Sequence, residues 1–308
     1  MKECTLYLTL ARGYVDRDEI TRMDSSALAG ARSAEGARFL IVSGDSVAVA
    51  PGAGSGELEV LKLDRNAAST WGSYNAVYLG RTGTTRYFAC DASGAEGQFD
   101  FRPIRLWAHL FNEVDTALAV SAVAVLAWQR TARFCSECGA ELTLRFTGWD
   151  KICENGHISY PRIDPAVIMA IHDQDDNLLL GRNTAWGPGR YSVLAGFVEA
   201  GETLEAAVRR EVFEETRIPV NKLEYFGSQP WPFPRSLMLA FQGWTDATER
   251  DIAVDGKEMA HAHFFSRSEF RSQLIAGAIR MPSPTSVAAT LVQTWLGESF
   301  AHMLGQHE

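Results

Sequence analysis

Apolar runs broken by turn residues characterise the first 130 positions of the chain. Such runs, bounded by Gly, Asn or Asp, predict short strands. The predicted strands are 39–42, 58–63, 76–79 and 86–89, the last two flanking a turn at Gly83. Two helical patterns follow at roughly 103–112 and 115–131, and the second has Asp115 and Thr116 available as a cap. Residues 1–130 therefore read as a small α+β domain, and their sequence alone indicates no chemistry.

The last part of the chain, 163–308, shows strands alternating with helices. Ala166–Ile171 is an apolar run that predicts a buried strand, paired as a hairpin with 177–181. Further strands are predicted at 224–229, 237–243 and 260–266, and helices at 203–216 and from about 283–286 to Leu296. This alternation favours a mixed sheet covered on both faces. No internal sequence repeat is evident.

Composition places the chain among ordinary globular proteins. Hydrophobic residues make up 46% and charged residues 22% of 308 positions, enough for about two domains and a small module. The net charge of −9 argues against binding nucleic acid through bulk charge. The longest near-continuous apolar run, Ala117–Trp128, is 12 residues and too short for a membrane helix. Met1–Cys4 lacks a signal-peptide pattern, so we expect a cytoplasmic protein without membrane contact.

Cysteines are concentrated in a central segment, 131–162. Cys135 and Cys138 form a C-x-x-C knuckle, and Cys153 follows 15 residues later with His157 close behind. This spacing is typical of a zinc ribbon with a closed, structural four-ligand site. We therefore predict one Zn²⁺ held by these four residues. The alternatives are that the three reduced cysteines are merely buried, or that His157 is a surface residue beside an incomplete site.

Three carboxylates lie on one predicted helix face. Glu211, Glu214 and Glu215 stand at i, i+3 and i+4, so they repel each other unless a cation lies among them. Oxygen-rich clusters of this kind suit Mg²⁺ or Mn²⁺. Glu202, with Arg209 or Arg210, is placed to anchor the preceding loop to the helix. For the three glutamates alone, an acidic solvated helix face is the competing interpretation.

The full spacing resembles the Nudix box, in which a glycine, a glutamate, an Arg-Glu pair and a Glu-Glu pair recur at fixed intervals. Here those places are taken by Gly196, Glu202, Arg210, Glu211, Glu214 and Glu215. The resemblance implies a Nudix α/β/α sandwich at 163–308. One departure is Arg217, where the family has a helix-ending glycine; a left-handed backbone is expected there.

A second motif, Ser228–Ser236, reads SQPWPFPRS and contains three prolines that stiffen the segment. From physics alone it is equally a rigid hairpin connection whose aromatic side chains fill the core. It looks like the signature of the NADH pyrophosphatase branch of the Nudix family. The zinc ribbon and the N-terminal domain match the same branch, with His157 in place of a fourth cysteine.

The resemblance implies roles for individual residues. Catalytic positions are Glu211, Glu214, Glu215 and Glu258, and the divalent-metal ligands are Glu211, Glu215, Glu258 and the carbonyl of Ala195. Substrate positions are Tyr160, Ile168, Phe197, Gln229, Pro230, Trp231, Pro232, Phe233, Pro234, Arg235, Ser236 and Ala288. Among these, Phe197 would stack on a base, and Tyr160 would close the pocket of the second subunit in a homodimer. For Tyr160, an interface or core role without ligand contact is the alternative.

The implied reaction is metal-dependent hydrolysis of NAD(H) to nicotinamide mononucleotide and AMP. Removal of an NAD cap from RNA 5′ ends breaks the same bond and leaves a 5′-monophosphate. The alternatives are hydrolysis of another nucleoside diphosphate such as ADP-ribose, or an inactive zinc-ribbon adaptor that binds nucleic acid. The intact glutamates of the box argue against the adaptor.

Overall fold

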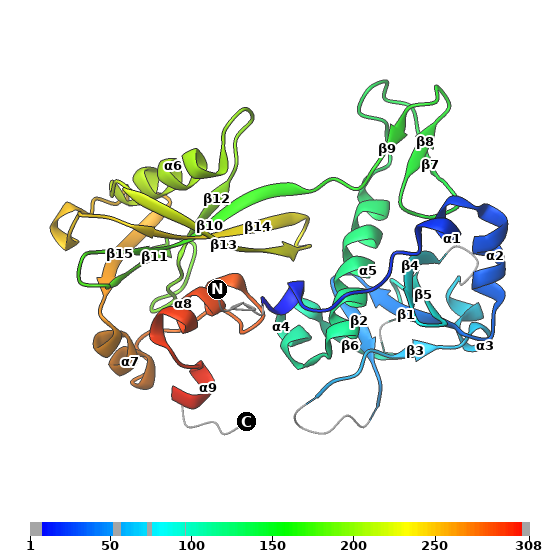
Figure 1. Ribbon diagram of the computed structural model, residues 1–308, viewed down its shortest axis with the longest axis horizontal. Helices are drawn as coiled ribbons and strands as arrows, with labels where there is room; N and C mark the ends of the chain where they lie inside the picture. Colours follow the sequence, from blue (N-terminus) through cyan, green and yellow to red (C-terminus); the bar gives the residue numbers. More distant parts are fainter. Residues whose placement is uncertain (1–7, 52–56, 73–75, 96, 304–308) are drawn as a thin grey trace. The chain divides into compact units, whose positions relative to one another are not determined.

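The computed structural model describes residues 8–51, 57–72, 76–95 and 97–303, so Met1–Cys4 lies outside the described residues. The chain divides into two compact units, described separately below (Figure 1). The C-terminal unit comprises Asp164–Gln229 and Ser236–Glu308 together with Met1–Thr9. The N-terminal unit comprises Leu10–Ile163 together with Pro230–Arg235. No helix in the described part of the chain is long and apolar enough to cross a membrane.

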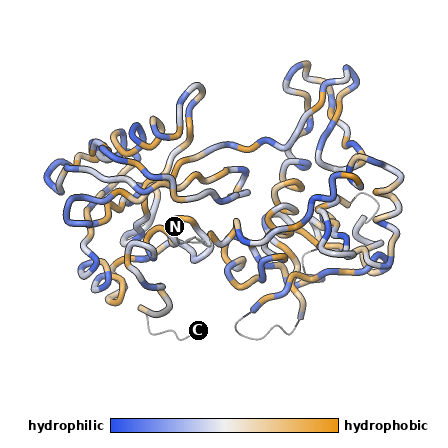
Figure 2. The backbone as a smooth tube through the Cα atoms, in the orientation of Figure 1, coloured by the Kyte–Doolittle hydropathy of each residue, from blue (hydrophilic) through white to orange (hydrophobic). Residues whose placement is uncertain are grey.

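A six-stranded mixed sheet forms the centre of the C-terminal unit, with strand order β13-β14-β10-β11-β15 and β12 paired to β10. β10 runs parallel to β14 and antiparallel to β11 and β12. The strands are β10 (Asp164–His172), β11 (Leu178–Asn183), β12 (Leu194–Phe197), β13 (Lys222–Trp231), β14 (Ser236–Trp244) and β15 (Met259–Phe265). The apolar run 166–171, which predicted a buried strand, forms the buried middle of β10 (Figure 2).

Helices cover both faces of this sheet (Figure 1). Val167, Met169 and Ile171 of β10 pack with α6 (Leu204–Thr216) on one face. Ile168 and Ala170 point to the other face, into a core that includes residues of α7 (Arg267–Ile275) and α8 (Val287–Leu296). The remaining short helices are η5 (Glu249–Asp251) and α9 (Phe300–Met303). The predicted α/β/α sandwich is confirmed.

The N-terminal unit contains a second six-stranded mixed sheet, with order β4-β5-β1-β2-β6 and β3 paired to β1. Its strands are β1 (Ala37–Ser43), β2 (Ser46–Val49), β3 (Lys62–Leu63), β4 (Val77–Thr82), β5 (Thr85–Asp91) and β6 (Asp100–Pro103). α5 (Glu113–Thr131) packs on one face, and α2 (Ser25–Ser33) and α3 (Arg65–Ala68) on the other. The other helices are η1 (Thr9–Ala11), α1 (Glu19–Met23), η2 (Ser69–Trp71), α4 (Ile104–Trp107) and η4 (Ala108–Leu110).

The two sheets share one topology. β1 to β6 occupy the places of β10 to β15 in strand order, and β1 is antiparallel to β2 and β3 and parallel to β5, as β10 is to β11, β12 and β14. The internal repeat that the sequence does not reveal is therefore present in the fold. The two copies differ at the position of α6: in the described residues that follow β3, the N-terminal unit has the four-residue α3 and then the short η2.

Two local expectations for the N-terminal unit need correction. The run 58–63 forms a strand only at Lys62–Leu63. The α5 cap is Asn112, whose side chain accepts from the Asp115 N–H at 2.8 Å, and not Asp115 or Thr116. Asp115 is instead buried, where it accepts from the Val60 N–H and pairs with Lys62 at 2.7 Å. A charged partner reached across the fold outweighs a local cap, and sequence periodicity does not show such a partner.

A three-stranded antiparallel sheet forms the ribbon at the end of the N-terminal unit (Figure 1). Its strands are β7 (Leu142–Leu144), β8 (Lys151–Cys153) and β9 (Ile158–Ser159). Cys135 and Cys138 precede β7, while Cys153 ends β8 and His157 precedes β9. The fold thus carries the four predicted ligands to one end of the ribbon.

Candidate active site and metal centres

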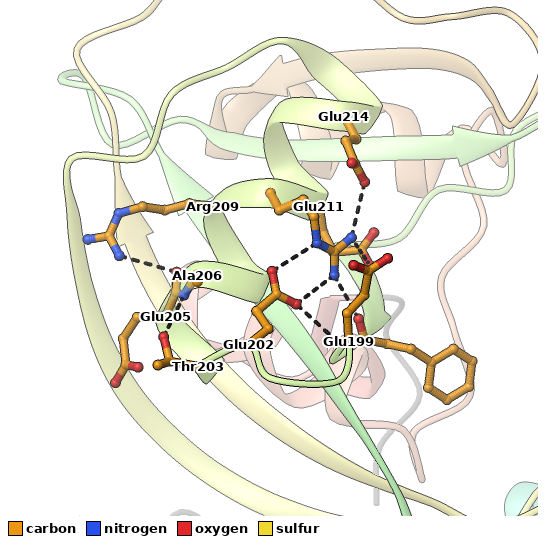
Figure 3. Close-up of polar contacts among 10 residues, drawn as sticks. Glu199, Glu202, Thr203, Glu205, Ala206, Arg209, Glu211 and Glu214 are labelled. Carbon is orange, nitrogen blue, oxygen red and sulfur yellow. Dashed lines mark hydrogen bonds and ion pairs between the residues drawn. The ribbon is translucent and has the colours of Figure 1, made fainter.

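Arg210 organises the start of the helix that bears the glutamates. Thr203 caps α6 by accepting from the Ala206 N–H at 3.2 Å. Arg210 then holds Glu202 through two bonds of 2.9 Å, Nε to Oε1 and Nη2 to Oε2. Its Nη1 also donates to Glu211 at 2.9 Å and to Glu214 at 3.1 Å, so three carboxylates converge on one guanidinium (Figure 3). Of the two arginines considered for the loop anchor, the structure selects Arg210.

The Glu211 carboxylate occupies the space beside Gly196 that a side chain would fill. A Cβ built on Gly196 would overlap the carboxylate carbon and both oxygens of Glu211. Gly196 lies on β12, directly opposite Val167 of β10. The box glycine is therefore required because an acidic side chain from α6 reaches the strand at this point.

Glu215 is the most perturbed carboxylate of the cluster. Burial, followed by repulsion from Glu211 and Glu258, raises its pKa to about 8. Its Oε2 is buried and has no hydrogen-bond partner among the described residues. A buried carboxylate oxygen without a donor is costly unless a cation lies beside it. Glu214, by contrast, is 56% exposed and paired with Arg210.

A turn holds Glu258 next to this cluster. The Asp255 Oδ1 accepts from three successive backbone N–H groups, those of Lys257, Glu258 and Met259, at 2.9, 3.1 and 3.1 Å. Thr184 fixes the same turn by donating its N–H to the Glu258 carbonyl at 2.8 Å and its hydroxyl to the Lys257 carbonyl at 2.6 Å. These two positioning residues were not predicted. Their signal, an Asp two residues before Lys257, is common to many turns.

The donor set fits a hard divalent cation. Glu211, Glu215 and Glu258 offer only oxygen, and Glu211 and Glu258 each raise the pKa of Glu215 by repulsion. Oxygen donors with excess negative charge suit Mg²⁺ or Mn²⁺. The orphaned Glu215 oxygen is the observation that supports this fit. Ala195 is exposed on β12 beside Gly196, where its carbonyl was expected to contribute.

Several predicted substrate residues share one face of the sheet. Strand register pairs Ile168 with Ala195 and Ala166 with Phe197. Phe197 is 57% exposed, as expected of a ring available for stacking. Ile168 and Ala288 lie instead within the buried core on this face, at 6% and 4% exposure. Ser236 begins β14 opposite Asp164. Their contact with a ligand stays a prediction.

The SQPWPFPRS motif forms the end of the β13–β14 hairpin. Gln229 is fully buried and donates to the Thr285 carbonyl at 3.1 Å. Pro230–Arg235 belongs to the N-terminal unit, where Trp231 and Phe233 pack against the core cluster that includes α5. The two rings meet edge to face at 4.9 Å. This packing matches the structural alternative for the aromatic side chains, and their substrate role stays a prediction, as does that of Tyr160, which is 65% exposed.

Cys135, Cys138, Cys153 and His157 form a compact cluster whose ligand atoms all lie within 4.8 Å of one another. The Cys138 and Cys153 sulfurs are 3.8 Å apart, and Cys135 Sγ is 3.6 Å from His157 Nδ1. Bonds of about 2.3 Å to a tetrahedral Zn²⁺ place sulfurs about 3.8 Å apart, so the spacing fits zinc. Hydrogen bonding, first from the Asn155 amide at 3.3 Å, lowers the pKa of Cys138 to about 6, which favours the thiolate that metals bind.

Comparison with known proteins matches two segments of the chain to described domain families. Residues 162–283 match the family described as NUDIX domain, and residues 36–128 match that described as NADH pyrophosphatase-like rudimentary NUDIX domain. Residues 162–283 are therefore similar to a Nudix domain, and residues 36–128 are similar to a rudimentary second one. The rudimentary domain accounts for the repeated sheet of the N-terminal unit.

Individual curated proteins with similar sequences carry more specific names than the domain families do. The chain is similar to the "NAD-capped RNA hydrolase NudC" of Mycobacterium bovis (strain BCG / Pasteur 1173P2), with 40% identity over 62% of this chain and 64% of that protein. It is 38% identical to the "NAD-capped RNA hydrolase NUDT12" of Homo sapiens, over 60% of this chain and 42% of that protein. It thus spans less than two thirds of these curated relatives. The solved NUDIX hydrolase from Nitrosomonas europaea aligns with TM-score 0.42 and 22% identity, over 54% of this chain and 94% of that one.

Proposed function

We propose that this chain hydrolyses the diphosphate of NAD(H) to nicotinamide mononucleotide and AMP, and removes the NAD cap from RNA 5′ ends to leave a 5′-monophosphate. One observation carries the proposal: Glu211, Glu215 and Glu258 form an oxygen-only cluster in which a buried oxygen of Glu215 has no partner among the described residues. The names of the relatives support the choice of substrate.

Each side chain of the proposed site has a distinct role in binding the cation, the water or the substrate. Glu211, Glu215, Glu258 and the Ala195 carbonyl would hold Mg²⁺ or Mn²⁺, which screens the phosphates and lowers the pKa of bound water. Glu215 or Glu258 would orient the attacking water and accept its proton. Arg210 fixes the box loop through Glu202, and Glu215 Oε2 has no hydrogen-bond partner among the described residues. Phe197, exposed on the opposite face of the strand from Gly196, would stack on a base.

Glu215→Gln tests the proposal, with Glu205→Gln as a matched control. Glu205 is exposed and lies on the same helix, so its variant changes charge equally without touching the cluster. Losing a cation ligand should reduce NADH hydrolysis with Mn²⁺ about a thousandfold, or roughly 4 kcal/mol, and leave the fold intact. A chelator should abolish the parent's activity. If Glu215→Gln keeps a third of that activity, the site is assigned wrongly, and turnover of ADP-ribose but not NADH would favour the alternative substrate.

We further propose one structural Zn²⁺ per chain, a cytoplasmic location and a homodimer. The three reduced cysteines of the ribbon support both the zinc and a reducing compartment. The exposed Tyr160 is available to a second subunit. Sedimentation tests the dimer: a fully active monomer at micromolar concentration would contradict it.

A further inference from the structure

Two arginines lie side by side in the C-terminal unit, away from the glutamate cluster. Arg190 and Arg280 are partners in a parallel β-bridge, and the Arg280 N–H donates to the Gly189 carbonyl at 2.7 Å. Both are exposed. The Arg190 guanidinium lies over the Trp186 ring, 4.8 Å from its centre, and Arg280 donates to the Pro188 carbonyl at 3.1 Å. Neither has a carboxylate partner among the described residues of the chain.

An anion would be attracted to this pair of positive charges. Exposed like charges on neighbouring residues repel each other weakly because solvent and salt screen them, and an anion between them would relieve that repulsion. The surrounding domain, 163–308, carries 19 acidic and 12 basic side chains, yet none of those acids pairs with either arginine in the described residues. Guanidinium groups bind phosphates in a bidentate fork, and an indole face stacks on bases. Two forks beside a tryptophan suit a nucleotide chain better than an isolated phosphate ion.

The position of these residues links them to the proposed reaction. The segment between β11 and β12 that carries Trp186 and Arg190 begins at Thr184, which is bonded to the backbone of Lys257 and Glu258. Lys257 adds an exposed cation at that junction. The segment that carries Trp186 and Arg190 is thus anchored at its start to the turn that holds Glu258.

We propose that Trp186, Arg190 and Arg280, here called the arginine surface, bind single-stranded RNA next to its NAD cap, with the arginines on phosphates and the tryptophan on a base. This inference rests on the proposed function and adds to it a way of distinguishing capped RNA from free NAD(H). The surface is local, so it is compatible with an acidic protein that has no extended basic track.

The test compares Arg190→Gln/Arg280→Gln with Lys222→Gln/Arg250→Gln, a control that removes the same charge from the same domain at exposed positions. The β-bridge is made by backbone atoms, so the fold should persist. For RNA with an NAD cap and a ten-nucleotide leader, the first variant should raise KM about tenfold and leave NADH hydrolysis unchanged. The slope of log(kcat/KM) against log[salt] should become shallower by about 1.4, since two phosphate contacts are lost.

Binding of a fluorescent 5′-monophosphate decamer, measured without turnover, separates the outcomes. Weaker decamer binding by the arginine variant alone supports the arginine surface. Unchanged binding, or an equal loss in both double variants, overturns it. An equal loss of NADH and capped-RNA turnover would mean that the arginines belong to the dinucleotide site, which also overturns it. A parent that binds the decamer through these arginines but cleaves neither substrate would contradict only the proposed function.

Discussion

We expect Gly196→Ala to lower the rate of hydrolysis strongly while it lowers the free energy of unfolding only slightly. This variant keeps every carboxylate of the cluster, unlike a substitution of one of the glutamates. The added methyl would overlap the Glu211 carboxylate, so that group must leave the cleft beside β12. The side chain is flexible at its end, and Arg210 keeps both bonds to Glu202, so only the 2.9 Å Arg210–Glu211 bond is lost. That loss costs about 1 kcal/mol, or about 2–4 °C in melting temperature.

The effect on the reaction should be much larger. Displacing one charged group that stabilises the transition state typically costs about 10²–10³ in kcat. We therefore expect kcat/KM for NADH to fall by that factor and Mn²⁺ affinity, measured by calorimetry, to fall with it. Restoring the cleft is not possible with a longer side chain at position 196, because every residue except glycine places a Cβ there.

Gly201→Ala is the matched control. Gly201 lies in the turn that follows β12, with φ of +86°, and a Cβ there meets nothing within 4 Å. Its substitution strains the backbone by about 1–2 kcal/mol without disturbing Glu211. The two variants should therefore lose similar stability and very different amounts of activity. If Gly196→Ala keeps a third of parental activity, or if Gly201→Ala loses as much as Gly196→Ala, the role assigned to the cleft is wrong.

Three further predictions concern the ribbon, the base and pH. His157→Ala should lower both zinc content by metal analysis and melting temperature, since structural zinc contributes folding energy; undiminished zinc would exclude His157 as the ligand. Phe197→Ala should weaken dinucleotide binding about ten- to a hundredfold, for a stacking energy of ~1–3 kcal/mol, and a base-free pyrophosphate ester should be cleaved as before; equal loss on both would make Phe197 structural. Burial lowers the pKa of His263, but the hydrogen bonds that its ring donates to the Glu249 and Glu269 carboxylates outweigh burial and raise the pKa above 6.5. The stability that protonated His263 gains from the two carboxylates is complete below pH 6.5 and is lost as the pH rises through the raised pKa. The melting temperature of the parent should therefore approach that of His263→Gln between pH 6 and 8.5. A constant difference between the two melting temperatures would contradict the pairing.

Features set by residues close together in the sequence could be predicted, but contacts between groups from several segments could not. The spacing of Glu211, Glu214 and Glu215 on a helix placed them correctly, and Arg217 adopts the expected left-handed backbone with φ of 64°. Asp255 was not foreseen because its role depends on three backbone N–H groups turning toward one oxygen. The proline-rich motif predicted stiffness but not whether Trp231 faces a ligand or a core.

The repeated sheet escaped sequence analysis for a related reason. Strand order is set by which hydrophobic faces meet, and many residues satisfy that requirement equally well. β1 and β10 therefore hold the same place in the strand order of their sheets.

The N-terminal unit shows how the same sheet topology packs when a long helix at the position of α6 is missing from the described residues. It closes a six-stranded sheet between helices although, in the described residues, the place of the 13-residue α6 is taken by the short helices Arg65–Ala68 and Ser69–Trp71, which bear no acidic side chain. The sandwich thus forms without a helix like the one that carries the glutamates in the C-terminal unit. Because the fold is repeated within one chain, the C-terminal copy carries the mutually repelling carboxylates of the cluster. The sequence of the N-terminal copy can then vary without changing that cluster, provided that its sheet and helices still pack.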